Sequence, residues 1–247
     1  MFYHHNSKKP LVEWFETNRV LGVELFTVYV HNITDSDYEI LKYYESKNVV
    51  EIFNWTLSEK VPGSNRPQSP PSDDIHSIGQ LAALNDCLYR NKGRSVFTMT
   101  TDLDELIIPH HQNDFSLIDM MNRVPNKAAF IFKHSYFPEV KGPRHPVVEM
   151  YGFDVAMLDH LRRGREINPA TDRSKMIFRP EAMVTVGIHN PWALLEPAET
   201  HVVDPDIGML HHYRSGDVVP EVTDKATEKY LGKVLENINR TMDALQN

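Results

Sequence analysis

The first half of the chain alternates two kinds of apolar pattern, and this alternation restricts the fold more than any other feature of the sequence. Glu24 to His31 and Asn48 to Trp55 are rich in β-branched and aromatic residues, which is typical of buried strands. Between them, the apolar residues of Asp37 to Lys47 recur at helical spacing. A strand, a helix and a strand in this order predict a parallel βαβ unit, because parallel strands need a crossover connection.

The same order continues downstream. From an N-cap at Asp73 or Asp74, Ile75 to Lys92 carries an apolar helical stripe, and the β-prone segment Ser95 to Thr100 follows it. We therefore expect an α/β fold, a three-layer sandwich with a mixed, mostly parallel central sheet. The strands expected in that sheet are Glu24 to Val30, Asn48 to Phe53, Ser95 to Thr100 and Ala128 to Phe132.

The other segments complete the expected outline. Val61 to Asp73 is rich in proline and serine, which predicts an irregular loop, and Phe137 to Arg173 has no pattern that predicts a regular element. The remaining expected elements are a helix over Pro10 to Val20, strands over Lys127 to Tyr136, Ser174 to Pro191 and Gly208 to Arg214, and a terminal helix after Asp217.

The net charge and the cysteine count argue against some classes of protein. The formal net charge is −8 and no block of lysine and arginine occurs, which argues against a nucleic-acid partner. A single cysteine, Cys87, excludes a disulfide within the chain. No apolar run approaches the roughly 18 to 20 residues that span a bilayer, so no membrane anchor is expected in the chain as given.

Three carboxylates, Asp102, Asp104 and Glu105, follow the Ser95 to Thr100 strand. If the extended backbone continues, Asp102 and Asp104 point to the same side, and their like charges repel unless a cation lies between them. Oxygen ligands suit Mg²⁺ and Mn²⁺, which keep coordination positions open for phosphate oxygens. The pattern predicts a metal and diphosphate site at the carboxyl end of a strand, where α/β sheets bind ligands. The competing interpretation is a solvated strand end or turn.

Five ordered blocks between about Pro10 and Ser215 resemble glycosyltransferase family 92. The blocks are LVEWFETNRVLGVELFTVYVHN, QLAALNDCLYR, DLDELIIP, SKMIFRPEAMVTVGIHNP and LHHYR. The resemblance implies a GT-A fold and a metal-dependent, inverting transfer, typically of galactose from UDP-galactose to a glycan acceptor. It also implies a type II membrane protein of the Golgi lumen, whose anchor precedes the catalytic domain in the full-length form.

Carried over residue by residue, the resemblance implies that Asp102 and Asp104 bind the nucleotide sugar and Mn²⁺ (or Mg²⁺), with Asp104 as the direct ligand. A late histidine often completes such metal sites, and LHHYR offers His211 and His212. Adjacent strand residues face opposite sides, so one of the two is expected at the metal, and we select His212. The alternative for either residue is an ordinary hydrogen-bonded histidine at a strand edge.

Two more residues are assigned to nucleotide-sugar binding. Lys175 and Arg179 are an even number of positions apart and share a strand face, and we select Lys175 for the diphosphate. His189 is assigned to the sugar or acceptor pocket. The alternatives are solvated charges on an outer strand and a packed histidine in a turn. Trp14 and Trp55 fall on apolar faces and are assigned to core packing.

An inverting transfer needs a base that takes the proton of the acceptor hydroxyl, and a carboxylate is expected in that role. Asp154, Asp159 and Glu166 lie in the segment before Lys175. The sequence does not choose among them, and the base stays unassigned.

The resemblance places the glycosyltransferase domain in residues 1–215 and a helical extension in residues 216–247. A GT-A domain ordinarily opens with a strand ahead of the LVEWF helix, and MFYHHNSKKP is too short and too polar to supply one. We therefore expect an N-terminally truncated chain that lacks this first strand.

Two alternatives come from other classes of protein. A phosphatase of the haloacid dehalogenase type also places Asp-x-Asp after an apolar strand, but Gly and Thr usually follow there, whereas Glu105 and Leu106 follow here. A non-catalytic relative would keep the fold and serve as a binding or interaction module without donor binding.

Overall fold

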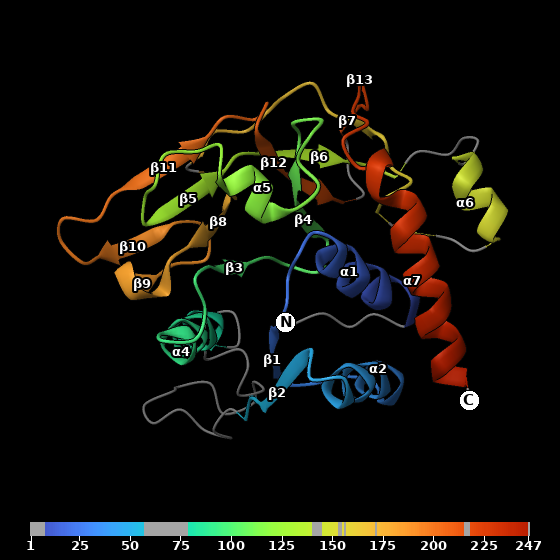
Figure 1. The fold of residues 1–247 in the computed structure, drawn as a ribbon, viewed down its shortest axis with the longest axis horizontal. Helices are drawn as coiled ribbons and strands as arrows, with labels where there is room; N and C mark the ends of the chain where they lie inside the picture. The colour runs from blue at the N-terminus through green and yellow to red at the C-terminus, as the bar shows by residue number, and fades with distance from the viewer. Residues whose placement is uncertain are drawn as a thin grey trace, which may run out of the picture.

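The computed structural model describes residues 8–56, 79–139, 145–152, 155, 157–170, 172–214 and 218–246, and Figure 1 shows their arrangement. The loop predicted over Val61 to Asp73 lies outside the described residues. The described helices include none that combines the length and the apolar character needed to cross a lipid bilayer.

The predicted βαβ unit is confirmed. Strand β1 (Phe26–Val30) and strand β2 (Val50–Asn54) pair in parallel on either side of helix α2 (Asp35–Ser46) in the sequence. Thr34 begins α2 as a side-chain cap, since its Oγ1 accepts a hydrogen bond from the Asp37 amide at 3.2 Å. The buried face of α2 carries Ile40, Leu41 and Tyr44 into the core.

A four-stranded sheet carries the strand that leads to the acidic residues. Helix α4 (Gln80–Asn91) precedes strand β3 (Thr98–Thr100), and the sheet order is β11 (Thr200–Val203), β5 (Ala129–Phe132), β8 (Lys175–Phe178) and β3. Strand β8 pairs antiparallel with both β3 and β5, whereas β11 and β5 are parallel.

The expectation of one mostly parallel central sheet is wrong for the described strands. β1 and β2 form a separate pair, and antiparallel pairs outnumber parallel ones. The length of the connections explains this difference. Parallel neighbours need long crossover connections, whereas the segments after β3 contain turns and short loops.

A three-stranded sheet follows immediately, with β12 (Gly208–Tyr213) between β4 (Glu105–Pro109) and β6 (His134–Phe137). The register places His212 opposite Glu105 on one side and opposite Tyr136 on the other. The single strand predicted over Lys127 to Tyr136 is divided at Lys133 into β5 and β6, which belong to different sheets.

The remaining elements are short. They are helices α5 (Leu117–Met121) and α6 (Pro146–Tyr151), the 3-10 turn η2 (Pro180–Ala182), the antiparallel pair β9 (Met183–Val186) and β10 (Pro191–Leu194), and the antiparallel pair β7 (Arg162–Arg163) and β13 (Val222–Thr223).

Helix α1 (Lys8–Val20) packs against the last helix, α7 (Glu228–Gln246), and against α2 (Figure 1). Between these helices the buried carboxylate of Glu16 accepts hydrogen bonds from Tyr44 Oη at 2.7 Å and Thr241 Oγ1 at 3.1 Å. The buried side chains of α7 join the same apolar core as those of α1, α2 and β4.

Candidate active site at the acidic turn

The acidic residues form a turn between two strands. Strand β3 ends at Thr100 and β4 begins at Glu105, so the backbone does not stay extended through Asp102 and Asp104. Trp14 of α1 holds this turn, because its indole Nε1 donates to the carbonyl oxygens of Asp102 at 3.1 Å and Glu105 at 3.2 Å. Trp14 is buried as predicted, and it has this second role that the sequence did not reveal.

Lys175 holds one side of the turn. It begins β8, its side chain is 2 % exposed, and Nζ lies 2.9 Å from Asp102 Oδ2 and 3.3 Å from Glu105 Oε2. Burial alone would lower the pKa of Lys175, but the charges of Glu105 and Asp102 more than offset it, and the pKa lies above its ordinary value. A buried ammonium is tolerated here because two carboxylates share its charge.

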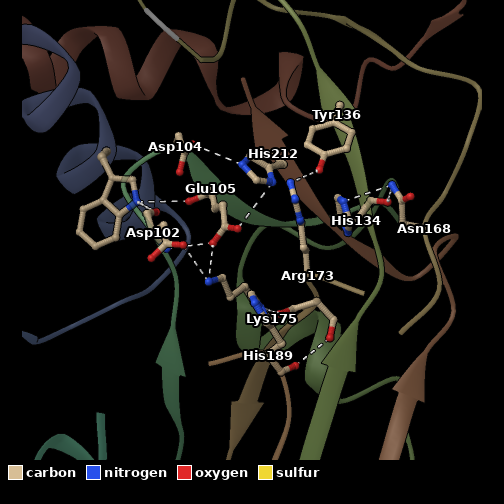
Figure 2. A network of polar contacts seen from close by, with 12 residues as sticks. Asp102, Asp104, Glu105, His134, Tyr136, Asn168, Arg173, Lys175, His189 and His212 are labelled. Atoms are coloured by element: carbon tan, nitrogen blue, oxygen red, sulfur yellow. Dashed lines mark hydrogen bonds and ion pairs between the residues drawn. The ribbon is translucent and has the colours of Figure 1, made fainter. Parts of the chain in front are cut away.

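Glu105 is the centre of the network. Its side chain is 2 % exposed, and Oε2 accepts a hydrogen bond from the Asp102 amide at 2.9 Å in addition to contacting Lys175. Burial raises the pKa of Glu105 to about 7, and the Lys175 charge acts in the opposite direction. Figure 2 shows this carboxylate between the two aspartates of the turn.

His212 holds the other side of the turn. Its Nε2 lies 3.3 Å from Asp104 Oδ2, and its Nδ1 lies 3.7 Å from Glu105 Oε1. Burial alone would raise the pKa of Asp104, but the hydrogen bond and charge of His212 outweigh it, so the pKa lies below its ordinary value. The predicted approach of His212 to Asp104 is therefore present in the structure.

The two aspartates differ from Glu105 in exposure. The side chains of Asp102 and Asp104 are 40 % and 32 % exposed, so a ligand reaches them, whereas Glu105 is covered. The expectation that both aspartates would converge on one point is wrong for this backbone, because the turn directs Asp102 to Lys175 and Asp104 to His212 (Figure 2). Within the described ranges, the turn holds no three ligand atoms all within 4.8 Å of one another.

A layer of polar residues lies behind His212. The Tyr136 ring is 5.0 Å from the His212 ring, and Arg173 Nη1 donates to Tyr136 Oη at 2.8 Å. Asn168 Nδ2 donates to His134 Nε2 at 3.1 Å, and burial lowers the pKa of His134 to about 4. Sequence analysis missed these residues, although the alternation in HSYF places His134 and Tyr136 on one strand face.

The other sequence-predicted residues have separate positions. His189 lies beside Lys175, where its Nδ1 is 3.1 Å from the Ser174 carbonyl oxygen, and burial followed by the Lys175 charge lowers its pKa. Arg179 instead donates to Asn126 Oδ1 at 2.8 Å and covers the Phe97 ring. Trp55 contacts the Tyr29 ring edge-on and is half-buried.

The three candidates for the base are not brought together at the turn. Asp159 accepts a hydrogen bond from the His145 amide at 2.8 Å, next to the start of α6, and Glu166 is exposed. Asp154 lies outside the described residues.

A cavity of about 950 Å³ adjoins the turn, and Asp102 and Lys175 are among its lining residues. Gly22 to Tyr29 line one part and Arg94 to Leu103 another. A cavity on one face of a strand would be lined by alternate residues, but successive residues line this one. The cavity therefore meets the edges of β1 and β3. Among the described strands, each of these two edges has no strand partner. The volume lies in the range of about 300 to 1,000 Å³ that is typical of ligand pockets.

A family model described as glycosyltransferase family 92 matches residues 1–246. A beta-1,4-galactosyltransferase of Caenorhabditis elegans, galt-1, is 29% identical over 111 residues, which cover 44% of this chain and 24% of that protein. Two proteins of the same organism are named glycosyltransferase family 92 proteins. One is 24% identical over 215 residues, 85% of this chain and 40% of that protein. The other is 23% identical over 194 residues, 75% and 35% respectively. The chain spans less than half the length of these relatives.

Proposed function

Because the chain belongs to glycosyltransferase family 92, we propose that it transfers a hexose, with galactose as the first candidate, from a UDP-sugar to a glycan acceptor at the acidic turn. Family membership favours this activity over the phosphatase alternative. The choice of galactose rests on the similarity to a protein named as a galactosyltransferase.

One observation carries the assignment of the site. Asp104 Oδ2 and His212 Nε2 lie 3.3 Å apart although the two residues are 108 positions apart in the chain. The Asp104 carboxylate is half-buried and its pKa is lowered, so it is ionised at neutral pH, and its accessible part is available to a cation or to a ligand hydroxyl. The neighbouring Asp102 offers a second exposed carboxylate on the same turn.

We propose that Asp104 and His212 hold Mn²⁺ or Mg²⁺, with Asp102 beside them. Carboxylate oxygens suit such an ion and an imidazole nitrogen can complete its coordination, and Asp104 Oδ2 and His212 Nε2 lie 3.3 Å apart. The ion would neutralise charge on the departing diphosphate.

Lys175 is better suited to positioning than to direct diphosphate binding. Its ammonium already contacts two carboxylates and its side chain is buried, so it has little surface to offer a ligand. We propose that Lys175 fixes the orientation of Asp102, and that His189 borders the same part of the site. The end of the cavity at Asp102 and Lys175 is the proposed place of the nucleotide.

Transfer with inversion requires a group that accepts the proton of the attacking hydroxyl. That group has to be accessible to the acceptor, and Glu105 is not, since its side chain is covered by Lys175, His212 and the turn. We therefore propose that Glu105 organises the site and that the base is a different carboxylate.

A donor panel tests the proposed function. Calorimetric titration with UDP-galactose, UDP-glucose and GDP-mannose in Mn²⁺ is expected to show binding of the UDP-sugars, with UDP-galactose the tightest, and loss of binding on chelation. Binding of none of the three donors would favour the non-catalytic alternative, and equal binding of all three would contradict the proposed preference for UDP-sugars. Release of UDP in the presence of a galactose-accepting glycan then measures the transfer itself.

A further inference from the structure

Strand β12 carries a second polar cluster on the face opposite His212. His211 alternates with His212 along the strand, so its side chain points to the other side. His211 Nε2 lies 2.8 Å from the Nε2 of His110, which directly follows β4. Asp224, which directly follows β13, has Oδ2 3.9 Å from His110 Nε2. One ligand atom from each residue lies within 4.8 Å of the other two.

The cluster combines two imidazoles and one carboxylate, which are ligand types that zinc binds. Burial is the main cause that lowers the pKa of both His110 and His211, which favours their neutral, metal-binding form. Arg163 Nε and the Ala226 amide both donate hydrogen bonds to the Asp224 carboxylate, which favours its ionised form. Two neutral imidazoles and one carboxylate can bind a metal without first losing protons.

The neighbours of the cluster orient it. His211 Nδ1 lies 3.2 Å from Tyr213 Oη, and the His211 ring stacks on Phe137 at 4.0 Å, which leaves Nε2 to face His110 and Asp224. A second hydrogen-bond partner on the far nitrogen is the usual environment of a metal-binding histidine. Asp224 Oδ1 accepts from the Ala226 amide at 3.1 Å.

Other charged groups near the cluster set limits on what it binds. Arg163 Nε donates to Asp224 Oδ2 at 3.1 Å, and the charges of Arg163 and Lys229 also contribute to the lowered pKa of His110. The charge of Asp206 acts on His110 in the opposite direction. Nearby cations weaken binding of hard ions held mainly by charge, so imidazole-preferring metals are favoured over Mg²⁺ and Mn²⁺.

We propose that His110, His211 and Asp224 form a binding site for Zn²⁺ that is separate from the acidic turn. Zinc takes imidazole and carboxylate ligands at about 2.0 to 2.2 Å, and tetrahedral geometry places two such nitrogens about 3.3 Å apart. The Nε2 atoms, now at 2.8 Å, therefore need only a small separation of the two rings. The ion joins β4, β12 and the segment after β13 that leads into α7, and it stabilises the attachment of that helix.

Metal titration of the whole chain tests this site. Chelator-treated protein is expected to bind one equivalent of Co²⁺ with the visible absorption of a four-coordinate nitrogen and oxygen site, and one equivalent of Zn²⁺ is expected to displace the Co²⁺. Zinc is also expected to raise the unfolding temperature, because it binds the folded state and its ligands are far apart in the unfolded chain.

Matched variants on the two faces of β12 distinguish the proposed zinc site from the acidic turn. His110→Gln and Asp224→Asn are each expected to weaken Zn²⁺ binding at least tenfold and to remove the temperature shift, whereas His212→Gln is expected to keep both. His110 is only partly buried, so His110→Gln is expected to fold even if the substitution of the fully buried His211 prevents folding. Unchanged Zn²⁺ affinity in both His110→Gln and Asp224→Asn, or no Co²⁺ absorption in the parent, would overturn the proposal.

Discussion

At the scale of single residues, the acidic turn is organised by a side chain that no ligand reaches. The Glu105 carboxylate contacts Lys175 and His212 and accepts a hydrogen bond from the Asp102 amide. The side chains of Asp102 and Asp104 stay partly exposed to solvent. The sequence identified all three carboxylates and predicted the proximity of His212 to Asp104. It did not predict that Lys175 would be neutralised by the carboxylates, because that pairing depends on β8 lying antiparallel to β3.

The raised pKa of Glu105 makes the stability of the fold decrease as the pH rises. The folded-state pKa is about 7 against an ordinary 4.5, so the contribution of Glu105 to the free energy of unfolding is complete below about pH 4.5 and is lost as the pH rises through 7. We expect the free energy of unfolding of Glu105→Gln, relative to that of the parent, to increase from pH 5 to pH 8 by at most about 3 kcal/mol, because only the parent loses this contribution. Urea denaturation at several pH values measures this difference. A difference that is constant with pH would show that Glu105 titrates normally.

Trp14 is expected to affect the site more than the fold. Trp14→Phe keeps an aromatic ring in the core and removes the single indole N–H that the carbonyl oxygens of Asp102 and Glu105 share, a loss of about 1 kcal/mol. We expect the affinity for UDP-sugar with Mn²⁺ to fall while circular dichroism stays unchanged. Trp192→Phe, at an exposed tryptophan, is the control. Equal donor affinity in Trp14→Phe and the parent would remove Trp14 from the support of the turn.

At the scale of elements, local patterns predicted individual helices and strands better than their pairing. β1, β2 and α4 lie within the segments predicted for them, since each segment has a clear period and turn residues at its ends. Helix α2 begins at Asp35, two residues before its predicted segment, because Thr34 caps it. Strand β4 is absent from the predicted strands, because the five residues of ELIIP are too short an apolar run to separate a strand from a buried helix segment. The antiparallel partners of β8 and β12 come from distant parts of the chain, and periodicity does not encode them.

Helix α7 is expected to be an integral part of the core. Leu235 is fully buried on its inner face, while Lys233 of the same helix is exposed. We expect Leu235→Ala to lower the free energy of unfolding by about 2 to 5 kcal/mol, and Lys233→Ala to change it by less than about 0.5 kcal/mol. Chemical denaturation gives both values. A loss below 1 kcal/mol for Leu235→Ala would indicate that α7 packs only loosely.

At the scale of the whole molecule, the proposed site exists only when distant segments meet. Trp14 comes from the first described helix, the acidic turn from the middle of the chain, Lys175 from β8 and His212 from β12 (Figures 1 and 2). The sequence located most of these residues through the family resemblance. The polar layer of His134, Tyr136 and Arg173 carried no such signal, because it depends on the pairing of β6 with β12.

The Asp104 and His212 pair is the centre of the proposed cation-dependent donor site, and one titration tests this role most directly. UDP-galactose binding is measured by calorimetry in Mn²⁺ for the parent, Asp104→Asn, His212→Gln and the distant control Asp243→Asn, with thermal unfolding as the check on folding. We expect both site variants to lose at least tenfold in affinity, the control to bind as the parent does, and all four to unfold at similar temperatures. Parent-like affinity in Asp104→Asn and His212→Gln, or parent binding that persists in excess chelator, would contradict the account.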